Sequence, residues 1–179
     1  MSIFRFLGID PGAAAPARAS SPEDVASIRR IVQSLDALEP AQARQIAAFA
    51  FVLSRVAGTD LDISEEEIRA MEKIVMDRMG LAEELAVLVV DIARRQNILF
   101  GGTDNFLVTR ELKASASDEE KEALLHCLFA VSAADESISS AEENTIAQIA
   151  SELGVEHRTM LEIRAVYRDK RAVLKDLPH

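Results

Sequence analysis

One pattern occurs twice in the sequence, at an offset of 75 residues, and it restricts the fold more than any other feature. Each copy contains an apolar helix, a short loop with an Asp, an apolar Ile, and a second helix that begins at a Ser and carries a Glu three positions later. Two such copies would pack about a pseudo-twofold axis and bring both loops to one face. The matched positions are Leu53, Val56, Asp60, Ile63, Ser64, Glu67, Met71 and Ile74, and Leu128, Val131, Asp135, Ile138, Ser139, Glu142, Ile146 and Ile149.

Signals for helix starts and stops divide the rest of the chain. Ser-x-x-Glu capping boxes predict helix N-termini at Ser64, Ser117 and Ser139, and Gly80 and Gly154 follow apolar stripes, as glycines beyond helix C-termini do. No segment alternates with the period of a strand. The sequence therefore predicts an all-α bundle of seven to eight helices, at about 22–38, 40–57, 65–79, 82–96, 106–113, 118–134, 140–153 and 156–170.

The chain is expected to form one folded body behind an N-terminal extension. Residues 1–21 combine a short apolar segment with a stretch rich in Gly, Ala, Pro and Ser, which is typical of a flexible linker. Residues 22–175 are predicted to be a single helical domain, because 179 residues suffice for one sizeable core. The predicted core contains Phe49, Leu53, Val56, Ile63, Ile74, Leu125, Leu128, Val131, Ile138, Ile146 and Ile149.

Composition excludes several classes of protein. With 30 acidic against 20 basic residues the formal charge is −10, which disfavours binding to a phosphate backbone. The only cysteine, Cys127, lies in an apolar run, where a core thiol is expected, and it has no intrachain disulfide partner. No apolar run approaches the roughly 18 residues of a membrane span. We expect a cytoplasmic protein with no nucleic-acid partner, no stable membrane insertion and no catalytic motif.

The second copy of the repeat carries a family resemblance. Its residues 133–154, AADESISSAEENTIAQIASELG, resemble the signature of the tellurite-resistance TerB family, in which an Ala-Ala-Asp-Gly loop precedes Ile-Ser and a Glu three residues later. The first copy, GTDLDISEEEIRAMEKI, is similar, although Leu61 and Glu136 stand where the family has glycine. The resemblance covers nearly all of residues 21–169. It implies a compact α-helical protein and a metal site at the loop acids Asp60, Glu67, Asp135 and Glu142.

Two interpretations of these four acids remain open. Carboxylates alone suit Ca²⁺ or Mg²⁺, whereas Ser64 with Glu67 and Ser139 with Glu142 are also complete as capping boxes. The first interpretation predicts a noncatalytic stress-response or adaptor module that holds a divalent cation in its acidic loops. The second predicts a metal-free module for binding a protein partner or for self-association, similar to the helical domain of DnaJ-like co-chaperones. A hydrolase with paired carboxylates around a metal is a distant third.

Overall fold

The computed structural model describes residues 22–56, 65–95, 105–134, 138–167 and 169, and the statements below concern these residues. Within them the chain forms eight helices and no strand, which confirms the all-α prediction. The helices are α2 (Pro22–Asp36), α3 (Pro40–Val56), α4 (Glu65–Met79), α5 (Glu83–Arg94), α7 (Asn105–Ser115), α8 (Asp118–Ser132), α9 (Ser140–Leu153) and α10 (His157–Val166).

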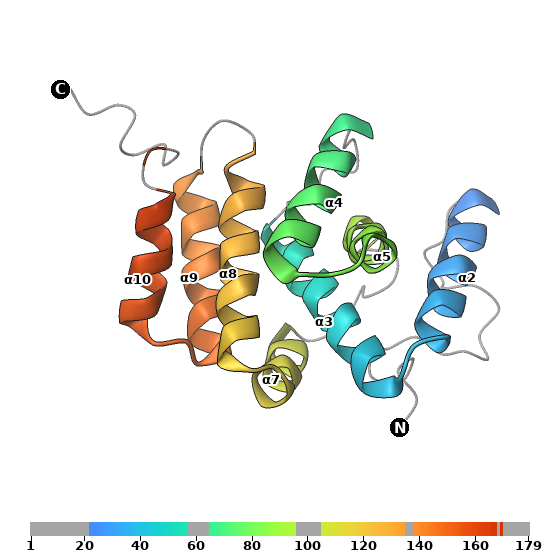
Figure 1. The fold of residues 1–179 in the computed structure, drawn as a ribbon, viewed down its shortest axis with the longest axis horizontal. Coiled ribbons are helices and arrows are strands. Elements are labelled where there is room, and N and C mark those ends of the chain that lie inside the picture. The colour runs from blue at the N-terminus through green and yellow to red at the C-terminus, as the bar shows by residue number, and fades with distance from the viewer. Residues whose placement is uncertain (1–21, 57–64, 96–104, 135–137, 168, 170–179) are drawn as a thin grey trace.

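The helices pack around α3, which contacts α2, α5, α7, α8 and α9. This central place follows from its sequence, since apolar residues occupy nearly all sides of the helix and most of them are buried. On one side of α3, the helices α8, α9 and α10 lie next to one another, and α7 crosses below them (Figure 1). Helix α4 packs on α5 and α8. Helix α2 lies at the end of the molecule opposite to α10 (Figure 1). No helix in the described ranges is both long and apolar enough to cross a membrane.

The helix ends follow the predicted capping signals. Ser117 and Ser139 each accept a hydrogen bond from the backbone N–H of the residue three positions later, and the Glu at that position accepts one from the backbone N–H of the Ser. Gly80 and Gly154 adopt φ values of 63° and 76°, a left-handed conformation that favours glycine. Ser64, the third predicted cap, lies outside the described residues. These contacts fix where α4, α8 and α9 begin or end.

Most of the predicted core positions are buried. Phe49, Leu53, Val56, Leu125, Leu128, Val131, Ile138, Ile146 and Ile149 are at most 6% exposed. Ile74 is only partly buried, and Ile63 lies outside the described residues. The last helix ends at Val166 rather than near Lys170, because Tyr167 leaves helical geometry with φ −103° and ψ 18°.

The two copies of the predicted repeat are represented by α3 with α4 and by α8 with α9. Helices α8 and α9 pack against each other, whereas α4 packs mainly on α5 and α8. Residues 57–64, which connect α3 to α4, lie outside the described residues. Residues 135–137, in the connection between α8 and α9, also lie outside them. The equivalence of residues 47–80 and 122–154 in space therefore stays a prediction, as do the boundaries of a single domain at 22–175.

A polar contact joins the two halves of the bundle. Arg55 near the end of α3 forms two hydrogen bonds with Glu152 of α9, from Nη1 to Oε2 at 2.6 Å and from Nη2 to Oε1 at 3.1 Å. The side chains of Arg55 and Glu152 are 9% and 18% exposed. Burial raises the pKa of Glu152, but Arg55, Gln148 and Thr109 stabilise the carboxylate and bring its pKa below the ordinary value. The pair is thus a charged contact within an otherwise apolar interface.

Candidate functional site

The structure places only two of the four predicted metal ligands. Glu67 is exposed in the first turn of α4, and Glu142 lies in the first turn of α9. Asp60 and Asp135 lie outside the described residues. Among the residues that are described, no group of three His, Cys, Asp or Glu side chains is arranged to hold a metal ion. The divalent-cation site at these four residues therefore stays a prediction.

The Glu142 carboxylate has a structural role of its own. Its Oε2 accepts hydrogen bonds from the Ser139 backbone N–H at 2.8 Å and from Ser139 Oγ at 2.6 Å. Ser139 Oγ in turn accepts a hydrogen bond from the Glu142 N–H at 3.2 Å. These contacts satisfy backbone donors that a helix N-terminus otherwise leaves unpaired. The capping interpretation of this Glu is therefore confirmed, and one of its two carboxylate oxygens is engaged.

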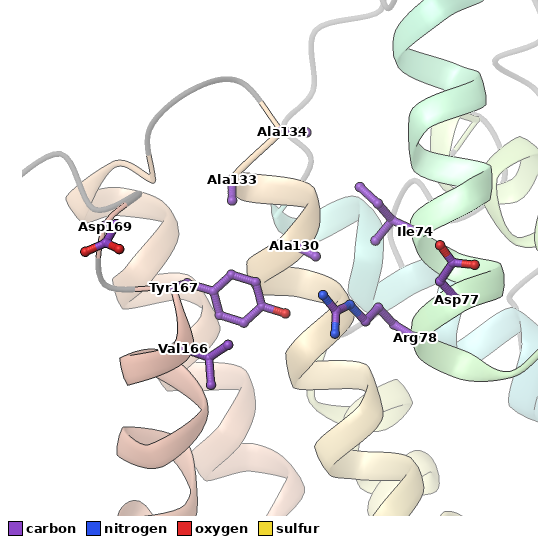
Figure 2. A pocket seen from close by; sticks show the side chains of 9 residues that line it. All are labelled: Ile74, Asp77, Arg78, Ala130, Ala133, Ala134, Val166, Tyr167 and Asp169. Carbon is purple, nitrogen blue, oxygen red and sulfur yellow. The ribbon is translucent and has the colours of Figure 1, made fainter.

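A groove on a different part of the surface is the more developed candidate site. It has a volume of about 610 Å³ and lies between α4, α8 and the end of α10 (Figure 2). This volume is in the range of ligand-binding clefts, roughly 300 to 1,000 Å³. Its lining is mostly apolar, with three charged side chains. The lining residues are Ile74, Asp77, Arg78, Ala130, Ala133, Ala134, Val166, Tyr167 and Asp169.

Small side chains at the C-terminal end of α8, and in the two residues that follow it, form the floor of this groove. Ala130 of α8 and Ala133 and Ala134 after it line the groove between Ile74 of α4 and Val166 of α10 (Figure 2). Val166 is 66% exposed, a large exposed fraction for an apolar side chain. An apolar strip bounded by two helices is a shape that another helix can fill.

Tyr167 forms the α10 side of the groove and is held in place from below. Its ring stacks on Phe129, with the ring centroids 5.5 Å apart. Its hydroxyl donates a hydrogen bond to the His126 backbone carbonyl at 2.9 Å, and His126 Nδ1 lies 3.4 Å from the same hydroxyl. Burial raises the pKa of Tyr167, while the charge of Arg78 lowers it by less. The Tyr167 side chain is therefore fixed in position and uncharged, and it lines the groove with its ring and its hydroxyl oxygen.

Arg78 supplies positive charge to the groove. It lies in the last turn of α4, where a cation is favoured by the helix dipole, and its guanidinium extends toward the Tyr167 hydroxyl (Figure 2). The positive charge of Arg78 also affects His126 on the neighbouring helix α8. Burial lowers the pKa of His126, and the charge of Arg78 lowers it further, against an opposing contribution from Glu122. Asp77, the neighbouring residue of α4, forms an ion pair with Lys73 at 3.1 Å.

Cys127 is a core residue, as its apolar sequence context predicts. The residue is 1% exposed, and burial raises the pKa of its thiol to about 12. At neutral pH the thiol is therefore protonated, whereas nucleophilic attack requires the thiolate. The neighbouring His126 is partly buried and close to the Tyr167 hydroxyl.

The groove was missed by reasoning from the sequence. Its residues come from α4 and from the C-terminal ends of α8 and α10 with the residues that follow them. Ile74 belongs to the repeat, and Ala133 and Ala134 begin the signature of its second copy, but neither pattern predicts that these residues meet in a groove. The signal that was present is the group of small residues Ala130, Ala133 and Ala134 at the end of an apolar stretch. Such a group indicates close approach by a neighbouring backbone, although it does not identify the neighbour.

Comparison with known proteins assigns the family. The family model described as tellurite resistance protein TerB matches residues 46–165, from α3 to α10. This range includes both predicted acidic loops and all of the groove except Val166, Tyr167 and Asp169. Searches of curated proteins and of solved structures gave no significant match. The match to the family model covers more than half of the chain, and the fold is all-α. This protein therefore belongs to the TerB family.

Proposed function

We propose that this protein is a noncatalytic cytoplasmic adaptor that binds a partner protein in the groove between α4, α8 and α10. The observation that carries the proposal is the groove itself, an apolar strip with an alanine floor and charged side chains at its edges. The family match supports a role as a tellurite-resistance-related helical module. The burial and raised pKa of Cys127, the only thiol of the chain, support a binding rather than a nucleophilic role for this region.

The surface beside the groove also favours a protein partner. Val166 at the end of α10 lines the groove and is 66% exposed, although it is a large apolar side chain. Contiguous exposed apolar surface on a protein commonly marks an interaction site. Charged residues at the groove edges, Arg78 and Asp169, resemble the polar rim that surrounds the apolar centre of an interface.

A divalent cation held by the acidic loops is the second candidate. The family match spans both loops, and oxygen ligands from Asp60, Glu67, Asp135 and Glu142 would suit Ca²⁺ or Mg²⁺. A bound cation would link the two loops through its charge. Glu142 would have to share its carboxylate with the Ser139 cap or leave it.

The groove proposal is tested by a pair of matched substitutions. Ala130→Gln adds a side chain to the groove floor, whereas Ala70→Gln makes the same change at an exposed position of α4 that does not line the groove. Tagged wild type and both variants are expressed in the native organism, and the bound proteins are quantified by mass spectrometry. We expect a defined set of partners to be lost only from Ala130→Gln. If the two variants retain the same partners, the groove is not the binding surface.

A further inference from the structure

We propose that the occupant of the groove is an amphipathic helix of a partner protein, which places an acidic side chain against Arg78. This inference rests on the proposed function, because it specifies what binds in the same groove. It adds the secondary structure of the partner, the charge of one of its residues and the residue of this protein that recognises that charge.

The shape of the groove favours a helix. Helix α8 has 15 residues and is therefore about 22 Å long, at roughly 1.5 Å per residue. Ala130 near its end, and Ala133 and Ala134 after it, line the groove with small side chains, and the distance between two packed helices depends on the size of the side chains between them. A helix can therefore approach the C-terminal end of α8 closely, with Ile74 and Val166 contacting its flanks.

The placement of Arg78 favours an acidic residue on that helix. The guanidinium extends across the groove toward Tyr167, and within the described residues it makes no hydrogen bond or ion pair. The Tyr167 hydroxyl already donates its proton to the His126 carbonyl, so its oxygen can accept a hydrogen bond but not balance a charge. Covering Arg78 without a counter-charge would remove its hydration at a cost. A carboxylate from the occupant restores the balance and provides specificity.

The far edge of the groove adds an orientation. Asp169 lies past the end of α10, across the groove from α4, as Figure 2 shows. A helix with an acidic residue toward Arg78 and a basic residue toward Asp169 matches both edges. The reverse placement brings like charges together at Arg78 and at Asp169, which disfavours binding. Asp77 also lines the α4 edge, but its charge is paired with Lys73.

His126 provides a readout that is specific to the charge at Arg78. The groups that face it are Arg78 from α4, Tyr167 from α10 and Glu122 on α8 itself. A bound carboxylate offsets the charge of Arg78 and so raises the pKa of His126, whereas burial of His126 by any ligand lowers it. Two peptides that differ only in Glu against Gln bury His126 equally. The pKa of His126 is therefore expected to be higher in the Glu complex than in the Gln complex.

The experiment uses the full chain and a displayed library of helical peptides. The peptides have apolar residues at helical spacing, and the flanking positions vary among Glu, Gln and Lys. We expect enrichment of peptides with an acidic residue at one fixed place beside the apolar stripe. Calorimetry should then show about a tenfold loss of affinity for Arg78→Gln, and no loss for the control Arg69→Gln at another exposed position of α4. NMR titration measures the pKa of His126 in the Glu and Gln complexes.

The outcomes separate this inference from the proposed function. Peptides that lose affinity with Ala130→Gln, but bind equally well with Glu or Gln and with Arg78→Gln, would overturn the acidic helix and leave the groove as a binding surface. A library that yields no binder, or only binders indifferent to Ala130→Gln, would overturn the helical occupant, whereas the groove as a binding surface is refuted by equal partner capture with Ala130→Gln and Ala70→Gln. An unchanged melting temperature of Arg78→Gln confirms that its effect arises from binding, because Arg78 is exposed.

Discussion

Replacing Arg55 by methionine removes both hydrogen bonds to Glu152 and leaves a carboxylate with no charged partner between α3 and α9. Loss of one partner of a buried pair costs about 3 to 5 kcal/mol, whereas an exposed pair contributes about 0 to 1 kcal/mol. Glu152 is 18% exposed and keeps a hydrogen bond from Gln148 at 2.9 Å. The expected loss in the free energy of unfolding lies between these limits, at about 2 to 3 kcal/mol.

Urea denaturation followed by circular dichroism measures this loss. The control is Arg158→Met, because Arg158 and Glu162 form an ion pair of the same type with side chains 87% and 64% exposed. The control should lose less than about 0.5 kcal/mol. The double replacement Arg55→Met with Glu152→Leu should cost less than the sum of the single changes, since no uncompensated charge remains.

The contribution of the pair should also depend on pH. The pKa of Glu152 is lower in the folded protein than its ordinary value, so its ionised form stabilises the fold. This stabilisation is fully present above the unfolded-state pKa of about 4.3 and is lost as the pH falls through the lower folded-state pKa. The difference between wild type and Arg55→Met should therefore shrink below about pH 4.

Two results would refute this reasoning. A loss below about 0.5 kcal/mol for Arg55→Met would show that the pair behaves as an exposed one. A stability difference that stays constant from neutral pH to about pH 3 would show that methionine acts through packing and not through loss of the Glu152 charge.

Four further predictions concern the core, the helix ends and the acidic loops. Leu128 is 0% exposed, and Leu128→Ala should lower the free energy of unfolding by about 2 to 5 kcal/mol in urea titrations. Ser139→Ala removes the cap of α9 and should cost about 1 kcal/mol in the same assay, and no loss would mean that the cap is unimportant. Gly154→Ala should lower the melting temperature through a cost of about 1 to 2 kcal/mol, because φ is 76° there; the nearest atoms belong to the flexible Lys113 side chain. If the loops bind a cation, millimolar Ca²⁺ or Mg²⁺ should raise the melting temperature of wild type, and Asp60→Asn or Asp135→Asn should reduce that rise. If the melting temperature is identical with chelator and with either cation, the hypothesis that the acidic loops bind a cation has no support.

Local features of the fold could be predicted because they depend on neighbouring residues. The capping box of Ser139 and Glu142 joins positions three apart, and Gly154 ends its helix through its own backbone conformation. Core positions such as Leu125 and Leu128 follow from helical periodicity, since a helix has one face toward the interior. These signals gave the number, type and approximate bounds of the helices.

Contacts between distant residues could not be predicted in the same way. Arg55 and Glu152 are 97 positions apart, and many other pairs of Arg and Glu would have been equally plausible from the sequence. Ile74 was predicted to be in the core because it continues an apolar stripe, but it is only partly buried and also lines the groove. The groove requires knowledge of how α4, α8 and α10 pack.

Tyr167 stacks on Phe129 beside the groove, and it is the only tyrosine in a chain that has no tryptophan. The intrinsic fluorescence of the unmodified protein therefore comes from one known place, at the contact between α8 and α10. A ligand that covers this ring should change the emission without any added label. During unfolding the same signal follows the separation of α10 from α8, while circular dichroism follows all helices together. Coincident transitions would indicate that α10 unfolds with the rest of the bundle, and an earlier change in fluorescence would reveal that the last helix detaches first.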